Sequence, residues 1–506
     1  YLTGLILAGG EGVEARQLSV TFLHTTDLHG HILPTASNPG GSLLKCATAI
    51  QDIRAREKNV LLVDCGDAIQ GSAESWLTGG KAVVRAMEWL KYDAWTLGNH
   101  DFDWGIRKLA ALHDDTTLTL LGANIGVRPD TNNRLHKIKP FIIKEVDGLR
   151  IALVGLTTPA VPLWLRYAQL DTIQFEDSVE TLGRIMPGVR AQRPDITVLV
   201  IHQGCDPAGD DAASQVWRIA KCFPEFDLIL GGHSHQVIDG ARIGDSLFSE
   251  AGYHGGWLGK ASLVFDTVQR KLVEVKTEAL SVEQNAPCAA LYDLLKDDLE
   301  KASSYLAEEV GTTTTEITSE YKMPGQSSGQ QLVARSIAAA TRADIVLHGI
   351  LSEAVIHAGT ITKGDVWEIV PYENRIGVLQ LTFQELREVL EENARFAGST
   401  HFMGVYGVAY DFCPDAEDGY RIRNLRLADG TKPHGKQRFR VAVNSYALAS
   451  GGGRFRVLAR LAERPNTRME MTRVDTRTAV ADYIARKSPL DIHADTQAVA
   501  VLKECE

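Results

Sequence analysis

Five short segments in the first half of the chain carry side chains that can bind metal ions, and each follows an apolar stretch. The segments are 27–30, 64–67, 98–103, 202–204 and 231–235. A single aspartate or histidine in such a place is more often a structural or surface group than a ligand. Because five segments of this kind occur within one region, we predict that they share one metal site.

Seven side chains in these segments are candidate ligands, namely Asp27, His29, Asp67, Asn99, His202, His233 and His235. The set combines imidazole, carboxylate and amide groups without thiolates, which disfavours a structural zinc site built from cysteines. Oxygen and nitrogen ligands of this mixture suit Mn, Zn, Fe or Co, and Mg less well. Seven ligands are too many for one tetrahedral ion, so we predict two divalent metal ions with Asp67 bridging them. Two ions about 3.5–4 Å apart can clamp a phosphoryl group during hydrolysis.

The elements that must position these side chains can be read from the apolar pattern. Apolar runs at 20–24, 60–64, 94–98, 197–201 and 227–230 precede the five segments, and helical spacing occurs at 43–56, 82–90 and 179–193. Unbroken apolar runs are typical of strands buried on both faces, and their alternation with helices predicts a layered α/β domain. Ligands of such sheets bind beyond the carboxyl ends of the strands, where the five segments lie.

A chain of 506 residues is too long for one hydrophobic core, which rarely exceeds about 300 residues, so we predict two domains. The first covers 17–282 and the second, also α/β, covers 311–506. A linker at 283–310 contains a charged helix at 289–309. In the second domain we predict helices at 330–341 and 383–397 and strands at 344–347, 377–381, 407–412 and 439–443.

Composition excludes several classes of protein. A hydrophobic content of 44% rules out a mostly disordered chain, and a net charge of −11 without a basic run predicts no binding to nucleic acid polymers. No stretch reaches the roughly 18 apolar residues of a membrane span. The apolar run at 2–8 has two open interpretations: the end of a secretory signal, or a first strand or added leading residues.

Four motifs of the first half resemble those of the calcineurin-like metallophosphoesterases: DLHG at 27–30, DCGD at 64–67, GNHDFDWG at 98–105 and GGHSH at 231–235. The resemblance is to the 5'-nucleotidase branch in particular. It implies a four-layer β-sandwich flanked by helices, followed by a smaller C-terminal α/β domain that recognises nucleotides. It also implies that Asp27, His29, Asp67 and His235 hold one ion and that Asp67, Asn99, His202 and His233 hold the other.

The resemblance assigns catalytic roles to two further residues. His100 would face the phosphate and stabilise the transition state or protonate the leaving oxygen, and Asp103 would orient His100 and keep it protonated. Nearby polar residues are assigned no ligand role; these are His31, Asp64, Asp101, Asp206 and His254.

In the second domain, the resemblance places substrate-binding residues at Asn374, Phe402, Tyr446 and Arg454, with Phe402 and Tyr446 sandwiching a base. Two features depart from the family pattern. The stretch 347–353 lacks the usual arginine, and 451–455 lacks the usual acidic residue. A glycine-rich loop that ends in Arg454 could instead contact a phosphate or a sulfate.

We therefore predict a hydrolase that releases phosphate from nucleoside phosphates with water activated by the two ions. Hydrolysis of a cyclic nucleotide, of another phosphorylated metabolite or of a sulfur-oxyanion ester is the alternative on the same site. A binding protein without activity is a third interpretation, which the pair of His100 and Asp103 disfavours. The family resemblance implies a periplasmic or extracellular location.

Overall fold

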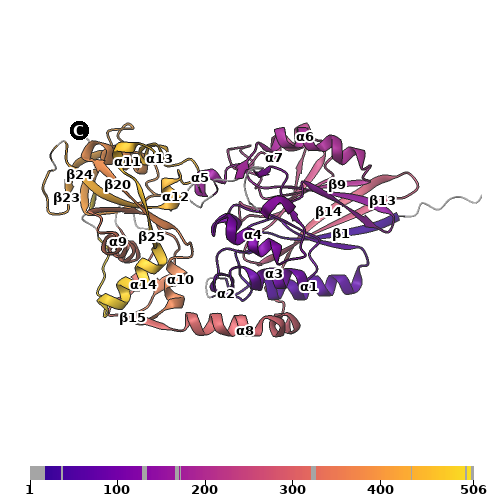
Figure 1. Ribbon diagram of the computed structural model, residues 1–506, viewed down its shortest axis with the longest axis horizontal. Coiled ribbons are helices and arrows are strands. Elements are labelled where there is room, and N and C mark those ends of the chain that lie inside the picture. Colours follow the sequence, from indigo (N-terminus) through magenta and orange to yellow (C-terminus); the bar gives the residue numbers. More distant parts are fainter. Residues whose placement is uncertain are drawn as a thin grey trace, which may run out of the picture.

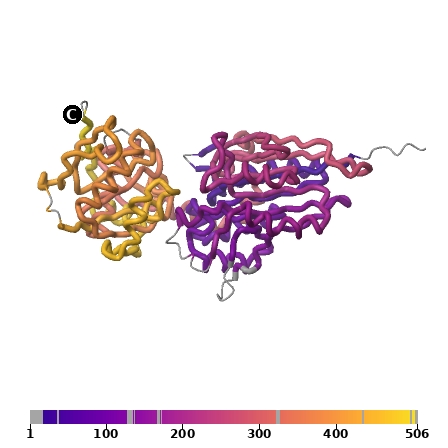
Figure 2. Tube along the Cα trace, turned by 90° about the horizontal axis from the view of Figure 1, so that it is seen from above, coloured from indigo at the N-terminus to yellow at the C-terminus, as the bar shows by residue number. Residues whose placement is uncertain are grey.

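The computed structural model describes residues 17–35, 38–127, 134–165, 170, 173–320, 326–432, 434, 436–495 and 498–502. The apolar run at 2–8, with both of its interpretations, therefore lies outside the described residues. Two α/β domains lie side by side (Figures 1 and 2). Helix α8 (Ala289–Leu306) and strand β15 (Glu309–Thr313) connect them along the lower edge of the molecule in Figure 1.

Two mixed sheets form the centre of the described part of the first domain. One has the strand order β14 (Lys271–Ser281), β13 (Trp257–Asp266), β1 (Gln17–Thr25), β2 (Val60–Asp64), β3 (Ala94–Thr96) and β4 (Leu120–Leu121). The other has the order β11 (Val237–Ile243), β12 (Ser246–Ala251), β10 (Leu228–Gly231), β9 (Ile196–Ile201), β7 (Leu149–Leu156) and β6 (Phe141–Val146). In the first sheet, β1, β2 and β3 are parallel to one another. In the second sheet, β7, β9 and β10 are parallel to one another.

The two sheets pack face to face, and helices cover their outer faces. Val20 and Phe22 of β1 share one buried core with Ile151 and Leu153 of β7, whereas Leu23 of β1 faces the helices. Helices α1 (Leu43–Arg56), α3 (Lys81–Trp89) and α4 (Ile106–Asp114) cover the first sheet, and α6 (Ser178–Ala191) and α7 (Val216–Cys222) cover the second. The predicted four-layer arrangement is confirmed.

The second domain is smaller and is built around a mixed sheet with the order β21 (Gly404–Tyr406), β17 (Ile345–His348), β24 (Arg438–Asn444), β20 (Arg375–Thr382) and β25 (Glu470–Asp475). One face packs on α9 (Ser328–Thr341), α10 (Lys363–Ile369) and α14 (Thr476–Lys487). The other face packs on α11 (Phe383–Ala394), α12 (Ser445–Leu448), α13 (Arg456–Ala462) and the sheet of β22 (Val408–Phe412), β23 (Ile422–Leu427) and β26 (Val499–Val501).

The linker helix is shorter than predicted. α8 ends at Leu306, and Glu309 already pairs with Thr362 of β19 (Gly359–Thr362), because the chain enters the second domain as a strand. The apolar side of α8, formed by Leu291, Leu295 and Leu299, is buried with the core of the first domain. The domain boundaries 17–282, 283–310 and 311–506 stay a prediction.

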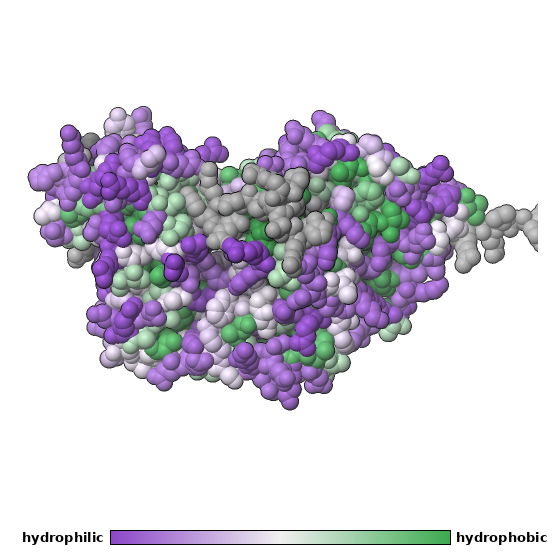
Figure 3. Space-filling view, viewed as in Figure 1, coloured by the Kyte–Doolittle hydropathy of each residue, from purple (hydrophilic) through white to green (hydrophobic). Residues whose placement is uncertain are grey.

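Hydrophilic residues cover most of the face shown in Figure 3, and its apolar residues lie in small separate groups. None of the described helices is both long enough and apolar enough to cross a membrane.

Candidate metal centre between two domains

The five predicted segments all follow strands whose carboxyl ends meet at one edge of the sandwich. Asp27 and His29 follow β1, Asp67 follows β2 and Asn99 follows β3. The remaining histidines follow β9 and β10 of the second sheet; they are His202, His233 and His235. Because β1 to β3 are parallel, and β9 and β10 are parallel, the loops after their carboxyl ends lie at one edge of each sheet, as expected for an α/β domain.

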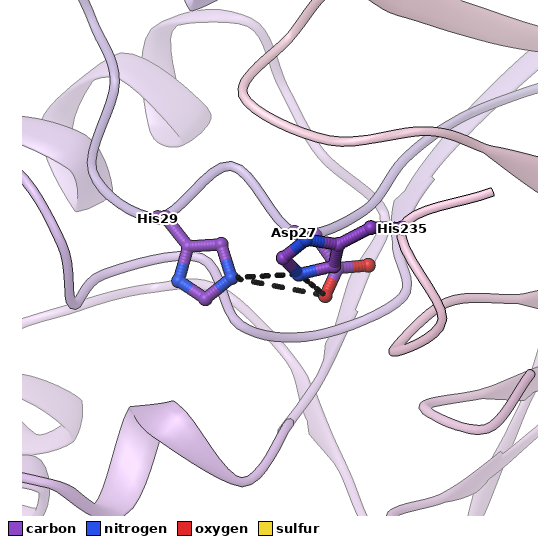
Figure 4. A group of neighbouring side chains, drawn as sticks. All are labelled: Asp27, His29 and His235. Carbon is purple, nitrogen blue, oxygen red and sulfur yellow. Dashed lines mark hydrogen bonds and ion pairs between the residues drawn. The ribbon is translucent and has the colours of Figure 1, made fainter. Parts of the chain in front are cut away.

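Asp27, His29 and His235 form the first cluster, in which one ligand atom of each lies within 4.8 Å of the others (Figure 4). Nε2 of His29 faces Nε2 of His235 at 3.2 Å, and Oδ1 of Asp27 lies 3.3 Å from Nε2 of His235. Nδ1 of His29 lies 3.0 Å from the carbonyl of Gln70, which can only accept, so Nδ1 carries the proton and Nε2 presents a lone pair.

Asp67, His202 and His233 form the second cluster, with ligand atoms again within 4.8 Å of one another. Nδ1 of His202 donates to the carbonyl of Cys65 at 2.8 Å, which leaves Nε2 to face the site. That Nε2 lies 3.2 Å from Oδ1 of Asn99 and 3.1 Å from Oδ2 of Asp67. The same Oδ2 lies 4.0 Å from Nε2 of His29, so Asp67 stands between the two clusters.

The loops hold the candidate ligands in a costly backbone conformation. Left-handed φ values occur at Asp27 (49°), His29 (47°), Asp67 (56°), His233 (79°) and His235 (57°). Such conformations cost about 1–3 kcal/mol each in non-glycine residues and persist only where the surroundings enforce them. Contacts with the surrounding structure, rather than the intrinsic preference of the backbone, therefore hold these loops in shape.

Asp101 supplies part of that enforcement. Its carboxylate accepts hydrogen bonds from the backbone N–H groups of Asp67 (3.1 Å), Ala68 (3.0 Å), Ile69 (3.1 Å) and Gly98 (2.8 Å). These contacts fasten the loop after β2 to the loop after β3. A supporting role of this kind agrees with the absence of a predicted ligand role for Asp101.

Other polar residues without a predicted ligand role also support the loops. Asp64 accepts from Thr25 (2.7 Å) and from the N–H of Gly66 (2.9 Å), and the N–H of His254 donates to the carbonyl of Asp27 (2.8 Å). The rings of His31 and His254 pack together with their centroids 3.8 Å apart. Asp206 accepts from the N–H of Ala208 in an exposed turn.

The residues present fit two cations. Among the described residues, Oδ1 of Asp27 is buried with no acceptable hydrogen-bond geometry, although Nε2 of His235 lies 3.3 Å away, and the Nε2 atoms of His29 and His235 converge beside it at 3.2 Å. Burial lowers the pKa of His29 to about 3 and that of His233 to about 4, which favours the neutral forms that bind metals. Burial opposes a charge on His202, but Asp67 outweighs it and raises the pKa to about 10, so an arriving cation would displace a proton there.

His100 lies beside both clusters without belonging to either. Its Nδ1 lies 2.8 Å from Oδ2 of Asp103, and its backbone N–H donates to Oδ1 of Asp67 at 2.6 Å. Burial lowers the pKa of His100, but the carboxylates of Asp103 and Asp67 outweigh burial and raise it to about 9. The imidazole is therefore protonated at neutral pH and can offer Nε2–H to an oxygen in the site.

A cavity of about 590 Å³ opens from this centre and is lined by both domains. The predicted substrate residues Asn374, Tyr446 and Arg454 line it together with His100 and Asp67. Phe402 does not: it is buried with 2% of its surface exposed, while its neighbours His401 and Met403 line the cavity. Asn393 fixes this orientation through two hydrogen bonds to the backbone of Met403, at 2.7 and 2.8 Å. The structure thus does not bring Phe402 and Tyr446 together as a base sandwich.

Sequence reasoning missed two aromatic residues that cover the centre. Tyr372 stacks on His100 with ring centroids 5.7 Å apart, and Trp164 of α5 (Pro162–Leu165) lies 5.1 Å from the ring of His233. Tyr372 stands two residues before Asn374, so the predicted binding position could have pointed to it. Trp164 follows β7, whose end carries no metal-binding side chain and therefore gives no signal of a site.

The segment that carries Tyr372 is fixed by Arg477. The guanidinium donates to the carbonyls of Val370 and Pro371 at 2.9 Å each and lies 3.2 Å from Oε1 of Glu373. Glu373 also accepts from the indole N–H of Trp104, which belongs to the loop of His100 and Asp103. Arg477 therefore supports a contact between the two domains directly beside the centre.

Replacement of Arg477 by methionine should destabilise the second domain by about 3 kcal/mol, because it leaves the buried carboxylate of Glu373 without its cation. Chemical denaturation of the two proteins measures this difference. Arg486→Met, an exposed change on the same helix α14, is the control and should leave stability within about 0.5 kcal/mol. Equal stability of all three proteins would contradict the role given to Arg477.

Comparison with known proteins agrees with this two-domain architecture. Residues 20–237 match the family model for calcineurin-like phosphoesterases, and residues 309–460 match that for the 5'-nucleotidase C-terminal domain. The crystal structure of a 5'-nucleotidase precursor from Thermus thermophilus shares the fold, with a TM-score of 0.75 and 23% identity over 96% of this chain and 100% of that one.

Two curated relatives cover most of this chain. Endonuclease YhcR of Bacillus subtilis is 25% identical over 90% of this chain, which spans only 39% of that protein's length. A 5'-nucleotidase of Vibrio cholerae is 24% identical over 97% of this chain and 95% of its own length. The two family matches, in the order that the structure shows, identify the chain as a member of the 5'-nucleotidase family of calcineurin-like metallophosphoesterases.

Proposed function

We propose that the protein is a metal-dependent phosphoester hydrolase that releases phosphate from nucleoside phosphates. The observation that carries this proposal is the position of Asp67, between two candidate metal clusters and at the wall of a cavity that both domains line. Two adjacent cations suit phosphoryl transfer, because they neutralise the charge that develops on the phosphoryl oxygens.

Each part of the centre has a separate task in this reaction. Asp27, His29, Asp67 and His235 would hold one ion, and Asp67, Asn99, His202 and His233 the other. When bound, the ions supply Lewis-acid charge and a water acidic enough to react at neutral pH. His100 donates a hydrogen bond from Nε2 to the phosphoryl or leaving oxygen, and Asp103 keeps its ring oriented and charged.

The second domain would hold the leaving group. Tyr446, Asn374 and Met403 line the cavity away from the ligand residues, and an aromatic face accepts any base by stacking. Because Phe402 is buried elsewhere, the stacking surface would come from Tyr446 without that partner, and we expect weak discrimination among bases.

Removal of divalent metal should abolish activity. A purified sample dialysed against a chelator should lose hydrolysis of AMP to background, and re-addition of Mn, Zn, Fe or Co one at a time should restore it. Elemental analysis of the active protein should give about two ions per chain. Undiminished activity at less than one ion per chain would overturn the proposal.

A panel of substrates separates the alternatives on this site. We expect AMP to be hydrolysed with a higher kcat/KM than 2',3'-cyclic AMP, p-nitrophenyl phosphate, a thiosulfonate or single-stranded DNA. A preference for any of these over AMP would be compatible with the proposed metal centre, but it would replace AMP as the proposed substrate. The location outside the cytoplasm stays a prediction, which fractionation of the source cells would test.

A further inference from the structure

The loop that joins β10 to β11 carries two candidate ligands, His233 and His235, and passes the end of β12. Gly231, the last residue of β10, is paired with Glu250 of β12, and Ile238 of β11 is paired with the same residue from the other side. Glu250 therefore stands between the two ends of the loop that presents both imidazoles.

The side chain of Glu250 is fully buried and collects hydrogen bonds from this loop. Its Oε1 accepts from the backbone N–H of Ser234 at 3.1 Å and from that of Gln236 at 3.2 Å. The hydroxyl of Ser234 donates to the carboxylate as well, at 2.8 Å from Oε1 and 2.7 Å from Oε2. Because Ser234 and Gln236 flank His235, these contacts fix the backbone from which that imidazole extends.

His235 is held only loosely by the packing of its ring. Its side chain keeps 35% of its surface exposed, whereas the side chains of Asp27 and His202 have none exposed. Tyr253 stacks on the ring with centroids 5.0 Å apart, but it is itself 45% exposed. The φ of His235 is 57°, a left-handed value that residues other than glycine keep only where the surroundings enforce it.

His233 is held by other contacts. Its backbone N–H donates to Oδ2 of Asp27 at 2.9 Å, and its ring lies 5.1 Å from the rings of both Trp164 and His202. Support from Glu250 therefore matters more for the first cluster, to which His235 belongs, than for the second.

The contacts of Glu250 depend on the position of its oxygens more than on its charge. Both backbone N–H groups donate to one oxygen, and the other oxygen meets a hydroxyl, which can accept as well as donate. Burial, and then the charge of Asp27, raise the pKa of Glu250 to about 7, so the neutral form is accessible near neutral pH. An amide can therefore take over the same contacts, whereas a side chain shorter by one methylene cannot reach them.

We propose that Glu250 is a positioning residue that places His235 for the first of the two ions. Polar groups that orient a metal ligand commonly change the metal affinity about 10–100-fold. The inference rests on the proposed function in that it requires two ions, but it does not depend on the substrate.

Calorimetric titration of the metal-free protein with Mn²⁺ tests this without turnover. We expect two ions in the wild type, and in Glu250→Leu we expect one of them to bind about 10–100-fold more weakly. Glu250→Gln should bind both ions nearly as the wild type does, and Glu250→Asp should resemble Glu250→Leu. Glu278→Leu, a change of an exposed glutamate on β14, is the matched control and should change neither affinity.

A double substitution shows whether Glu250 acts through His235. His235→Ala should weaken the same ion, and Glu250→Leu added to it should cause little further loss, because residues that act through one contact are not additive. Full additivity would overturn the inference. So would Glu250→Gln as weak as Glu250→Leu beside a Glu250→Asp like the wild type, since charge rather than position would then decide. If circular dichroism shows that Glu250→Leu is unfolded, the comparison of Glu250→Gln with Glu250→Asp decides alone.

Failure of the proposed function gives a different result. A wild type that binds fewer than two ions would overturn the centre with two ions and the role of Glu250 together. Two ions in the wild type, bound with the same affinities in Glu250→Leu, would overturn the positioning role and leave the proposed function standing.

Discussion

Replacement of Asp67 by asparagine should lower kcat about 10³-fold or more and reduce the metal content of the protein. Asp67 is buried between the two clusters, with Oδ2 facing both His202 and His29. A shared carboxylate contributes to both ions, and the loss of several kcal/mol of transition-state stabilisation corresponds to this factor at 1.36 kcal/mol per tenfold. Elemental analysis and steady-state kinetics on AMP measure the two effects in one preparation.

The control for this variant is Asp115→Asn, which changes an exposed carboxylate of the same domain that pairs with Lys81. It should keep both the metal and the activity. Because the N–H of His100 donates to Asp67, a shift in the thermal midpoint of Asp67→Asn is expected as well, and circular dichroism should show that the variant is folded. Wild-type metal content together with wild-type kcat in Asp67→Asn would refute the bridging position.

Replacement of His100 by alanine should lower kcat about 10²–10⁴-fold, the usual contribution of a positioned acid or base, while the metal content stays unchanged. Among the described residues, the ring nitrogens of His100 form no hydrogen bond with a candidate ligand, and Nδ1 pairs instead with Asp103. The combination of lost turnover and retained metal separates catalysis from metal binding, and elemental analysis beside single-turnover kinetics measures it.

The variant Asp103→Asn tests the protonated state of His100 through the pH dependence of kcat. The carboxylate of Asp103 raises the pKa of His100, so the amide should lower that pKa, and the protonated ring should be lost at a lower pH. The alkaline limb of kcat against pH should therefore shift to lower pH in Asp103→Asn. His357→Ala, an exposed histidine of the second domain, should change nothing. An unshifted alkaline limb would remove Asp103 from the role given to it.

The layered fold and the gathering of five loops could be predicted from sequence because both depend on local signals. Apolar runs marked β1, β2, β9 and β10 to within a few residues, and parallel strands must place their carboxyl ends together. The apolar spacing at 43–56 predicts a helix with the bounds that α1 has, because apolar residues recur along one face. The structure adds that the side chain of Ser42 caps its first turn.

The side chains that line the cavity could not be predicted in the same way, because their positions depend on how the two domains meet. Trp164 and Tyr372 are far apart in sequence, and neither belongs to a periodic pattern. Phe402 shows the converse: its sequence neighbourhood fits a stacking residue, but Asn393 holds the backbone of Met403 so that the phenyl ring is buried. Side-chain direction in a loop is set by such distant partners.

The separation of the apolar cores has a consequence for how the protein loses its structure. None of the clusters of buried apolar residues in the described chain is shared between the two domains, and α8 packs with the first. The domains are coupled by polar contacts at Glu373 and Leu163 and by ring contacts of His100 with Tyr372 and of Trp76 with Trp367. Heating should therefore melt them in two independent transitions, with a van't Hoff enthalpy below the calorimetric value, and a ligand that spans the cavity would merge the two into one cooperative event.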